Sequence, residues 1–373
     1  MTTPTLIITN DFPPTIGGIE AFVAETCRSL DNQVVVLTRH TPGWRGHDQQ
    51  LPFRVIRHGS MLLPTPAVGR LATQLIKQEQ IRSVIFGAMA PLSLLTPVVR
   101  AAGADRVLAI SHGHETWWAS LPGSRRLLRR MAHEVDAVSV ISDYTRSRIA
   151  PALAPVDRGK LVTLPPPVDQ DQFRPAAAAP DSAQLRCIAV GRMVRQKGFD
   201  TLLRCWPAVL DQLRRVGRGP AELVLVGDGP QAPALRRAAD RWGVAHSVRF
   251  TGALSRERVA EELRSSTVFA LPVRTRLGGL NPEGLGLGFL EAASAGLPVV
   301  VGRSGGAPET VRDGVTGFVV QPDADGPLAD RIAGLLADPE RAAAMGRVGR
   351  SWVGQAYGTE RFRARLAAVL ASH

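Results

Sequence analysis

The sequence predicts an α/β protein built from two Rossmann-like domains. Two observations predict this class: short β-branched segments alternate with helical patterns along the whole chain, and a proline-rich break near its middle separates two such series. This alternation is typical of βαβ units, which form parallel sheets. A length of 373 residues and a hydrophobic fraction of 45% are consistent with two packed cores.

The first series starts near the N-terminus. Its expected strands are LIIT, VVVLT, RVIRH, SVIFG, VLAIS, AVSVIS and VTLP, with helices between them that include 19–30 and 125–135. The start of the chain carries no basic segment before its short apolar run, so we expect a strand there and not a signal peptide. The most apolar region, 84–99, is interrupted by Gly87, Pro91 and Pro97 and is predicted as a strand followed by a helix, not as a membrane span.

Three consecutive prolines at 165–167 end the first series, because proline continues neither a helix nor a strand ladder. The second series contains RCIAVG, ELVLVG, SVRFTG, VFALP, PVVVG and GFVV. We therefore expect domains at 1–166 and 167–356, and a C-terminal helix at about 357–373 that packs back onto the first domain. Open α/β sheets bind ligands at the carboxyl ends of their strands, so the active site is expected in the cleft between the domains.

Charge and cysteine content limit the classes of function. The net charge of +12 predicts an anionic partner: nucleotide phosphate, anionic lipid or nucleic acid. Arginine supplies most of the excess, which genomic composition can also produce. Nucleic acid is disfavoured because there is no zinc-finger spacing and no RNP-like aromatic strand, and aromatic residues make up 5% of the chain. Cys27, Cys187 and Cys205 form no CxxC pair, so neither a zinc site nor a disulfide framework is expected.

Two carboxylates flank a glycine-rich segment of the second domain. Glu283 and Glu291 lie eight positions apart, with the glycine-interrupted run Gly284–Leu287 between them and good helix formers after it. This pattern predicts a loop that enters a helix, whose N-terminus offers amide N–H groups to phosphate. Two carboxylates placed in this way suit two sets of hydroxyls on one ligand. The alternative is a surface glutamate beside a flexible lead-in.

Three further segments follow predicted strands. Arg192 and Lys197 lie in the loop that begins at Gly191 after CIAV. The planar guanidinium of an arginine and the ammonium of a lysine suit a diphosphate. A solvated basic turn would have the same composition. His112 follows VLAI, where we expect it to donate to a substrate and not to bind a metal. Gly17 and Gly18 follow the first strand, but the loop fits neither the dinucleotide nor the ATPase fingerprint.

A basic helix in the first domain is a candidate membrane surface. Its arginines are expected on one face of a helix that begins near Ser124, beside tryptophans and apolar residues. The residues in question are Trp117, Trp118, Arg125, Arg126, Arg129 and Arg130. Such a helix can lie on an anionic bilayer. The alternative is a solvated charged face with buried tryptophans.

One DxD sequence, Asp169-Gln170-Asp171, resembles a metal-binding motif. It follows the proline break directly, where an aspartate more often caps a turn, so we expect no metal site there and an activity that needs no metal ion.

Taken together, these motifs resemble those of the retaining family 4 glycosyltransferases, which have the GT-B fold. Within that family the chain is most similar to the actinobacterial GDP-mannose-dependent phosphatidylinositol mannoside mannosyltransferases of the second mannosyl step. The resemblance covers nearly the whole chain and rests on TNDFPPTIGGIE, SHGHE, LPGSRRLLRR, GRMVRQKGFD, EGLGLGFLEAASAG and SGGAPETV.

The resemblance implies a function and a role for each site residue. A hexose, mannose from GDP-mannose, would pass with retention to a glycolipid acceptor on the inner face of the cell membrane, with no cofactor. Arg192 and Lys197 would hold the diphosphate, Glu291 the ribose, and Glu283 with the N–H groups of 284–287 the hexose. His112 would touch the sugar, Gly17 and Gly18 would close on the phosphates, and the base would lie near Gly252 and Leu254.

Departures from the pattern leave alternatives open. Asn281-Pro282 precedes Glu283, and Thr116-Trp117-Trp118 follows HGHE, where the family has other residues. The donor could therefore be a UDP-sugar and the acceptor a soluble glycoside. A nucleotide-sugar epimerase shares the fold but needs differently placed acid–base carboxylates.

Overall fold

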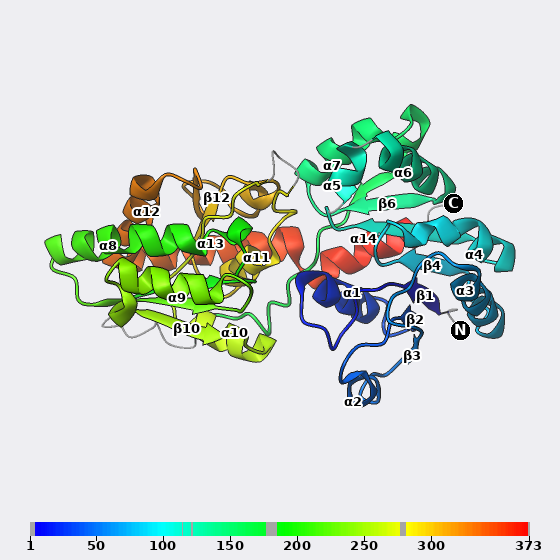
Figure 1. The fold of residues 1–373 in the computed structure, drawn as a ribbon, viewed down its shortest axis with the longest axis horizontal. Coiled ribbons are helices and arrows are strands. Elements are labelled where there is room, and N and C mark those ends of the chain that lie inside the picture. Colours follow the sequence, from blue (N-terminus) through cyan, green and yellow to red (C-terminus); the bar gives the residue numbers. More distant parts are fainter. Residues whose placement is uncertain (1–3, 114, 121, 177–184, 277–280, 372–373) are drawn as a thin grey trace. The chain divides into compact units, whose positions relative to one another are not determined.

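The computed structural model describes residues 4–113, 115–120, 122–176, 185–276 and 281–371, and the chain divides into two α/β units (Figure 1). The first unit comprises Met1–Pro167 and Thr359–His373, and the second comprises Val168–Gly358. Each unit has an all-parallel sheet with helices between successive strands, which confirms the predicted fold class.

The described residues of the first unit form a seven-stranded sheet in the order β3-β2-β1-β4-β5-β6-β7. Its strands are β1 (Thr5–Ile8), β2 (Val34–Thr38), β3 (Arg54–Arg57), β4 (Ser83–Phe86), β5 (Arg106–Ser111), β6 (Ala137–Val140) and β7 (Leu161–Thr163). Every residue of β1, β2 and β6 is buried, as expected for parallel strands covered on both faces. β1 pairs with both β2 and β4, so the strand order reverses at β1.

Helices of the first unit cover this sheet and close its core. They are α1 (Gly18–Ser29), α2 (Trp44–Asp48), α3 (Pro66–Gln78), α4 (Thr96–Ala102), α5 (Glu115–Ser120), α6 (Pro122–Glu134), α7 (Asp143–Ile149) and α14 (Thr359–Ala371). The region 84–99 forms β4, a short 3-10 turn and the start of α4. None of the described helices is both long enough and apolar enough to span a bilayer.

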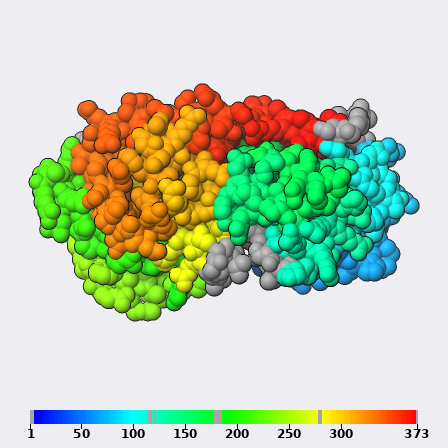
Figure 2. Space-filling model, turned by 90° about the horizontal axis from the view of Figure 1, so that it is seen from above, coloured from blue at the N-terminus to red at the C-terminus, as the bar shows by residue number. Residues whose placement is uncertain are grey.

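The last helix, α14, belongs to the first unit although the second unit precedes it in the chain. The Phe362 ring meets the Phe22 ring of α1 edge to face, with centroids 5.5 Å apart. The Arg106 Nε of β5 donates to the Val369 carbonyl at 2.9 Å. Figure 2 shows the red surface of α14 beside the cyan and blue-green surface of the first unit's own residues.

The described residues of the second unit form a six-stranded sheet in the order β10-β9-β8-β11-β12-β13. The strands are β8 (Leu185–Val190), β9 (Ala221–Val226), β10 (Val248–Gly252), β11 (Val268–Leu271), β12 (Val299–Gly302) and β13 (Gly317–Val320). The helices are α8 (Phe199–Arg215), α9 (Ala232–Arg241), α10 (Arg256–Arg264), α11 (Leu287–Ser294), α12 (Asp325–Ala337) and α13 (Pro339–Tyr357). β8 pairs with both β9 and β11, so the order reverses at β8.

Large apolar side chains fill the core of the second unit. Trp206 of α8 and Phe269 of β11 are fully buried, and the Phe269 ring meets Phe289 of α11 at 5.7 Å between centroids. The three cysteines are buried and unpaired, as expected. Burial raises the pKa of Cys27 and of Cys205 to about 12, so both thiols stay protonated and unreactive.

Candidate active site

The basic loop 191–198 leaves the carboxyl end of β8, the strand at which the sheet order reverses. It contains a 3-10 turn, η4 (Arg195–Lys197), and ends at Gly198, whose φ is +75°. A Cβ at Gly198 would lie 2.2 Å from the Pro272 carbonyl oxygen, so only glycine lets the loop press against the residues after β11. Arg274 fastens the loop: its Nε donates to the Arg195 carbonyl at 2.9 Å.

Lys197 of this loop forms an ion pair with Glu283, which lies before α11. The Lys197 Nζ lies 2.8 Å and 3.0 Å from the two Glu283 carboxylate oxygens. The side chains are 23% and 10% exposed, so the pair is partly desolvated and stronger than a surface pair. The neighbouring Gln196 Nε2 donates to the Pro282 carbonyl at 2.9 Å. The two residues that the sequence predicted for one site are therefore in direct contact.

The backbone at Glu283 is held by the segment that follows β12. The Gly306 N–H donates to the Glu283 carbonyl at 2.9 Å, and the Ser304 Oγ accepts from the Glu283 N–H at 3.3 Å. Gly305 has a φ of +56°, and a Cβ there would lie 1.9 Å from the Glu283 carbonyl oxygen. This close approach is the structural reason for glycine at position 305.

Arg192 is an exposed cation of the same loop. Its guanidinium forms no ion pair with any other described residue. An unpaired arginine at the carboxyl edge of a parallel sheet is available for a bidentate contact to phosphate.

Helix α11 carries Glu291 a little more than one turn from its amino end. Gly286 precedes the helix, and no described side chain caps it, so no side chain occupies the amides at its amino end. Within the first turn, the Phe289 N–H donates to the Gly286 carbonyl at 3.1 Å. Leu285 is buried and anchors the lead-in, while Gly284 and Leu287 are half-buried. The glycine-rich loop followed by a helix is thus as predicted.

Sequence reasoning did not identify the partner of Glu291. The Arg256 Nη2 lies 2.7 Å from the Glu291 Oε1. Burial raises the pKa of Glu291, and the positive charge of Arg256 opposes that rise. Arg256 opens α10 shortly after β10 ends at Gly252, so the expected base-binding residues Gly252 and Leu254 lie close to Arg256 in the chain.

In the first unit, His112 follows β5 and is buried. Its Nε2 lies 2.5 Å from the carbonyl oxygen of Gly87, which follows β4, and its ring meets Phe22 edge to face at 5.5 Å. The neighbouring Ser111 hydroxyl donates to the Glu115 carboxylate at 2.8 Å. The imidazole is thus held at the carboxyl edge of the sheet, where it was expected.

Gly17 and Gly18 are exposed at the amino end of α1, and Gly17 is its N-cap residue. A Cβ at Gly17 would lie 2.1 Å from the Glu20 carboxylate, so the Glu20 side chain folds back onto the amino end of the helix. Burial raises the pKa of Glu20, with a backbone hydrogen bond acting against it.

The four arginines of α6 are not equivalent. Arg125 Nη2 donates to the Pro151 carbonyl at 2.8 Å and Arg129 Nε to the Ala152 carbonyl at 2.7 Å, so both hold the residues after α7. Arg126 and Arg130 are exposed. Trp118 is half-buried against the first core, and the Trp117 side chain lies outside the described residues.

The DxD sequence caps a turn, as predicted. The Asp169 Oδ1 accepts the N–H groups of Asp171 at 3.0 Å and Gln172 at 2.9 Å. Among the described residues there is no group of three His, Cys, Asp or Glu side chains that could hold a metal ion.

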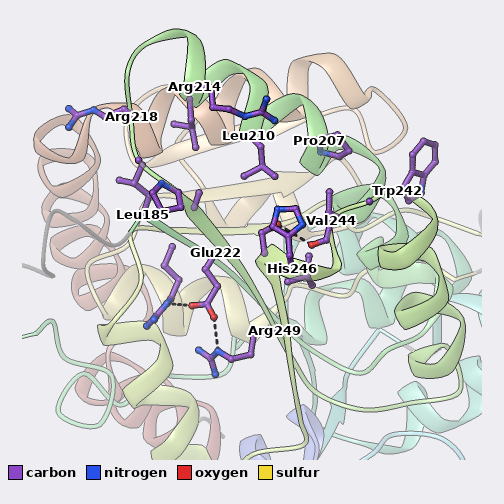
Figure 3. A pocket seen from close by; sticks show the side chains of 18 residues that line it. Leu185, Pro207, Leu210, Arg214, Arg218, Glu222, Trp242, Val244, His246 and Arg249 are labelled. Atoms are coloured by element: carbon purple, nitrogen blue, oxygen red, sulfur yellow. Dashed lines mark hydrogen bonds and ion pairs between the residues drawn. The ribbon is translucent and has the colours of Figure 1, made fainter.

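A cavity of about 1000 Å³ lies at the opposite edge of the second sheet (Figure 3). It is lined by the first residues of β8, β9 and β10 and by Trp242 and His246. Part of its charged wall is paired, since Glu222 bridges Arg186 at 2.7 Å and Arg249 at 2.9 Å. Because ligands of open α/β sheets bind at the carboxyl ends, we do not assign the active site to it.

Comparison with known families gives two matches. A model described as Glycosyltransferase Family 4 matches residues 16–172, and one described as Glycosyl transferases group 1 matches residues 184–338. Together they span both units.

Three curated relatives are similar over nearly their whole length. The GDP-mannose-dependent α-(1-6)-phosphatidylinositol monomannoside mannosyltransferases of Mycobacterium tuberculosis and Mycolicibacterium smegmatis are each 43% identical, over 98% of this chain and 97% of theirs. The GDP-mannose-dependent monoacylated α-(1-6)-phosphatidylinositol monomannoside mannosyltransferase of Corynebacterium glutamicum is 38% identical, over 99% of this chain and 98% of its own.

Solved structures agree on the fold. Anabaena HepE in complex with UDP and glucose has a TM-score of 0.79 at 16% identity and covers 99% of this chain and 100% of that one. Sucrose-phosphate synthase of Thermosynechococcus elongatus has a TM-score of 0.78 at 20% identity, and the match covers 99% of this chain and 98% of that one.

The packing at Gly305 predicts a large effect of one methyl group. Gly305→Ala should displace the Glu283 carbonyl, reduce turnover by more than tenfold and lower the free energy of unfolding measured in urea. Gly314→Ala is the matched control, because Gly314 also has a positive φ, +75°, but a Cβ there meets nothing within 4 Å. The control should cost only about 1–2 kcal/mol of backbone strain. Equal effects of the two substitutions would show that the contact with Glu283 is unimportant.

Proposed function

Because the chain belongs to glycosyltransferase family 4, we propose that it transfers mannose from GDP-mannose to a phosphatidylinositol mannoside lipid, with retention at the anomeric carbon. The 43% identity over 98% of the chain to mannosyltransferases named for this donor and acceptor carries the proposal. The contact between Lys197 and Glu283 at the carboxyl edge of the second sheet supports it, since it joins a phosphate ligand to a sugar ligand.

The donor is held mainly by the second unit. Glu291 accepts from the ribose hydroxyls, the base lies against the backbone at Gly252 and Leu254, and the loop from Gly191 carries the cations for the diphosphate. Glu283 and the amides of Gly284–Leu287 hold the hexose. From the first unit, His112 contacts the sugar, and Gly17 and Gly18 approach the phosphates.

The reaction needs no protein nucleophile in this proposal. The bond between the anomeric carbon and the β-phosphate oxygen breaks, the acceptor hydroxyl oxygen bonds to the same face of that carbon, and its proton passes to the departing diphosphate. Negative charge develops on the diphosphate, where preorganised Arg192 and Lys197 stabilise it. An ammonium has three donors, so Lys197 can keep Glu283 and still contact phosphate. No metal ion or other cofactor takes part.

The acceptor is a lipid, and we propose that the first unit meets it at the cytoplasmic face of the membrane. The exposed Arg126 and Arg130 on α6, next to the Trp117–Trp118 segment, provide a cationic surface for anionic headgroups. The protein would then be peripherally bound.

Thermal stabilisation by a panel of GDP- and UDP-sugars tests the donor. A ligand that binds only the folded protein adds about 2.7 kcal/mol at a hundredfold excess over its Kd. GDP-mannose and GDP should therefore raise Tm by several degrees, while UDP-sugars and free mannose should not. Stabilisation by a UDP-sugar alone would reassign the donor.

Removal of the Arg192 guanidinium should lower turnover more than it weakens donor binding. We expect Arg192→Ala to lower kcat by about 10²-fold, while the Kd for GDP-mannose changes only a few-fold, because the charge that it stabilises forms in the transition state. The matched control is Arg195→Ala, an exposed arginine of the same loop. Assays contain EDTA, since no metal is invoked. An Arg192→Ala enzyme with the kcat of the wild type would contradict the role.

Binding to liposomes that contain phosphatidylinositol tests the membrane surface. The double variant Arg126→Glu/Arg130→Glu should abolish sedimentation with these liposomes at low salt and leave GDP binding intact. It spares Arg125 and Arg129, which hold the backbone after α7. The control Arg237→Glu/Arg241→Glu reverses two exposed arginines with the same spacing on α9. An equal loss in both variants would mean that net charge alone, and not α6, drives binding.

A further inference from the structure

Arg256 occupies a defined position between two elements of the second unit. It is the first residue of α10, whose N-cap Ser255 accepts the Arg258 N–H at 3.4 Å. From there its Nη2 reaches the Glu291 Oε1 on α11 at 2.7 Å. The side chains are 29% and 12% exposed, so a nearly buried carboxylate faces a half-buried guanidinium.

The guanidinium also lies over an aromatic ring. The Arg256 Cζ lies 5.1 Å from the centroid of Phe173, which is fully buried. Such a cation–π contact restricts the plane of the guanidinium. Arg256 is thus held between Phe173 and Glu291.

The backbone of Phe173 is fastened to α11. The Ser294 Oγ, in the last turn of α11, donates to the Phe173 carbonyl at 2.8 Å. Arg350 of α13 donates to the same carbonyl at 3.1 Å and also to the Ser294 carbonyl. Phe173, Arg256 and Glu291 therefore form one braced unit, and the direction of the carboxylate is set before any ligand binds.

We propose that Arg256 is a positioning residue that fixes Glu291 as a ribose acceptor and so gives the enzyme its preference for ribonucleotides over deoxyribonucleotides. This inference rests on the proposed role of Glu291. With Oε1 engaged by Arg256, Oε2 is presented to the ribose hydroxyls. The positive charge of Arg256 also opposes the rise in the pKa of Glu291 that burial causes, and so favours the ionised carboxylate, which accepts through both oxygens.

Affinities for GDP, 2′-deoxy-GDP and 2′,3′-dideoxy-GDP, measured by calorimetry, test this proposal. The wild type should bind GDP about ten- to hundredfold more tightly than dideoxy-GDP, the range for hydrogen bonds to a charged group. Glu291→Gln should lose most of that ratio. Arg256→Gln should lose it too, through weaker GDP binding with dideoxy-GDP binding unchanged. Arg256→Lys, which keeps the charge without the planar fork, should retain part of it.

The control is Arg258→Gln on the same helix, since Arg258 pairs with the exposed Glu261 and should leave the ratio unchanged. If Arg256→Gln fails to fold, Arg256→Lys and Phe173→Leu carry the test, and both should lower the ratio.

The outcomes separate the two proposals. A wild type without preference for GDP over dideoxy-GDP would overturn the role of Glu291 itself. A ratio lost in Glu291→Gln but kept in the Arg256 variants would overturn only the role of Arg256. An equal loss for all three nucleotides would also overturn it, because Arg256 would then contact the nucleotide elsewhere.

Discussion

The ion pair between Lys197 and Glu283 is the interaction around which the second unit's site is built. It joins the loop after β8 to the segment that precedes α11, at the point where the strand order of the sheet reverses. Loops on either side of such a reversal diverge and leave room for a ligand. Two glycines let backbone close in around the pair: Gly198 against Pro272 and Gly305 against Glu283. Lys197 and Glu283 are thereby held in contact.

A second ion pair, between Arg256 and Glu291, repeats the same arrangement eight residues further along. Each of the two carboxylates has a cation within hydrogen-bond distance, which offsets the cost of its partial burial. Arg192 has no such partner among the described residues. Its positive charge is therefore uncommitted, which suits an incoming diphosphate, and the two carboxylates are already held in place by their cations. Little reorganisation is needed when the donor binds, which favours catalysis by preorganised charges.

The sequence predicted the strands, the first helix and the glycine-rich entry to α11, because these depend on local patterns of apolar residues, glycine and proline. It also predicted the turn capped by Asp169. It did not predict that Arg256 would meet Glu291, since that contact joins side chains 35 positions apart in the sequence. The same limit applies to α6, where periodicity placed four arginines on one face, but two of them are used by the carbonyls of Pro151 and Ala152. Residues brought together by tertiary packing leave no periodic signal in the chain.

The most direct test of the central claim is the mass and anomeric configuration of the product formed from GDP-mannose and a phosphatidylinositol monomannoside. The account predicts a lipid heavier by one hexose, joined through a new α-linkage, with release of GDP. No lipid product, a β-linkage, or conversion of GDP-mannose to another sugar nucleotide in the absence of acceptor would contradict it.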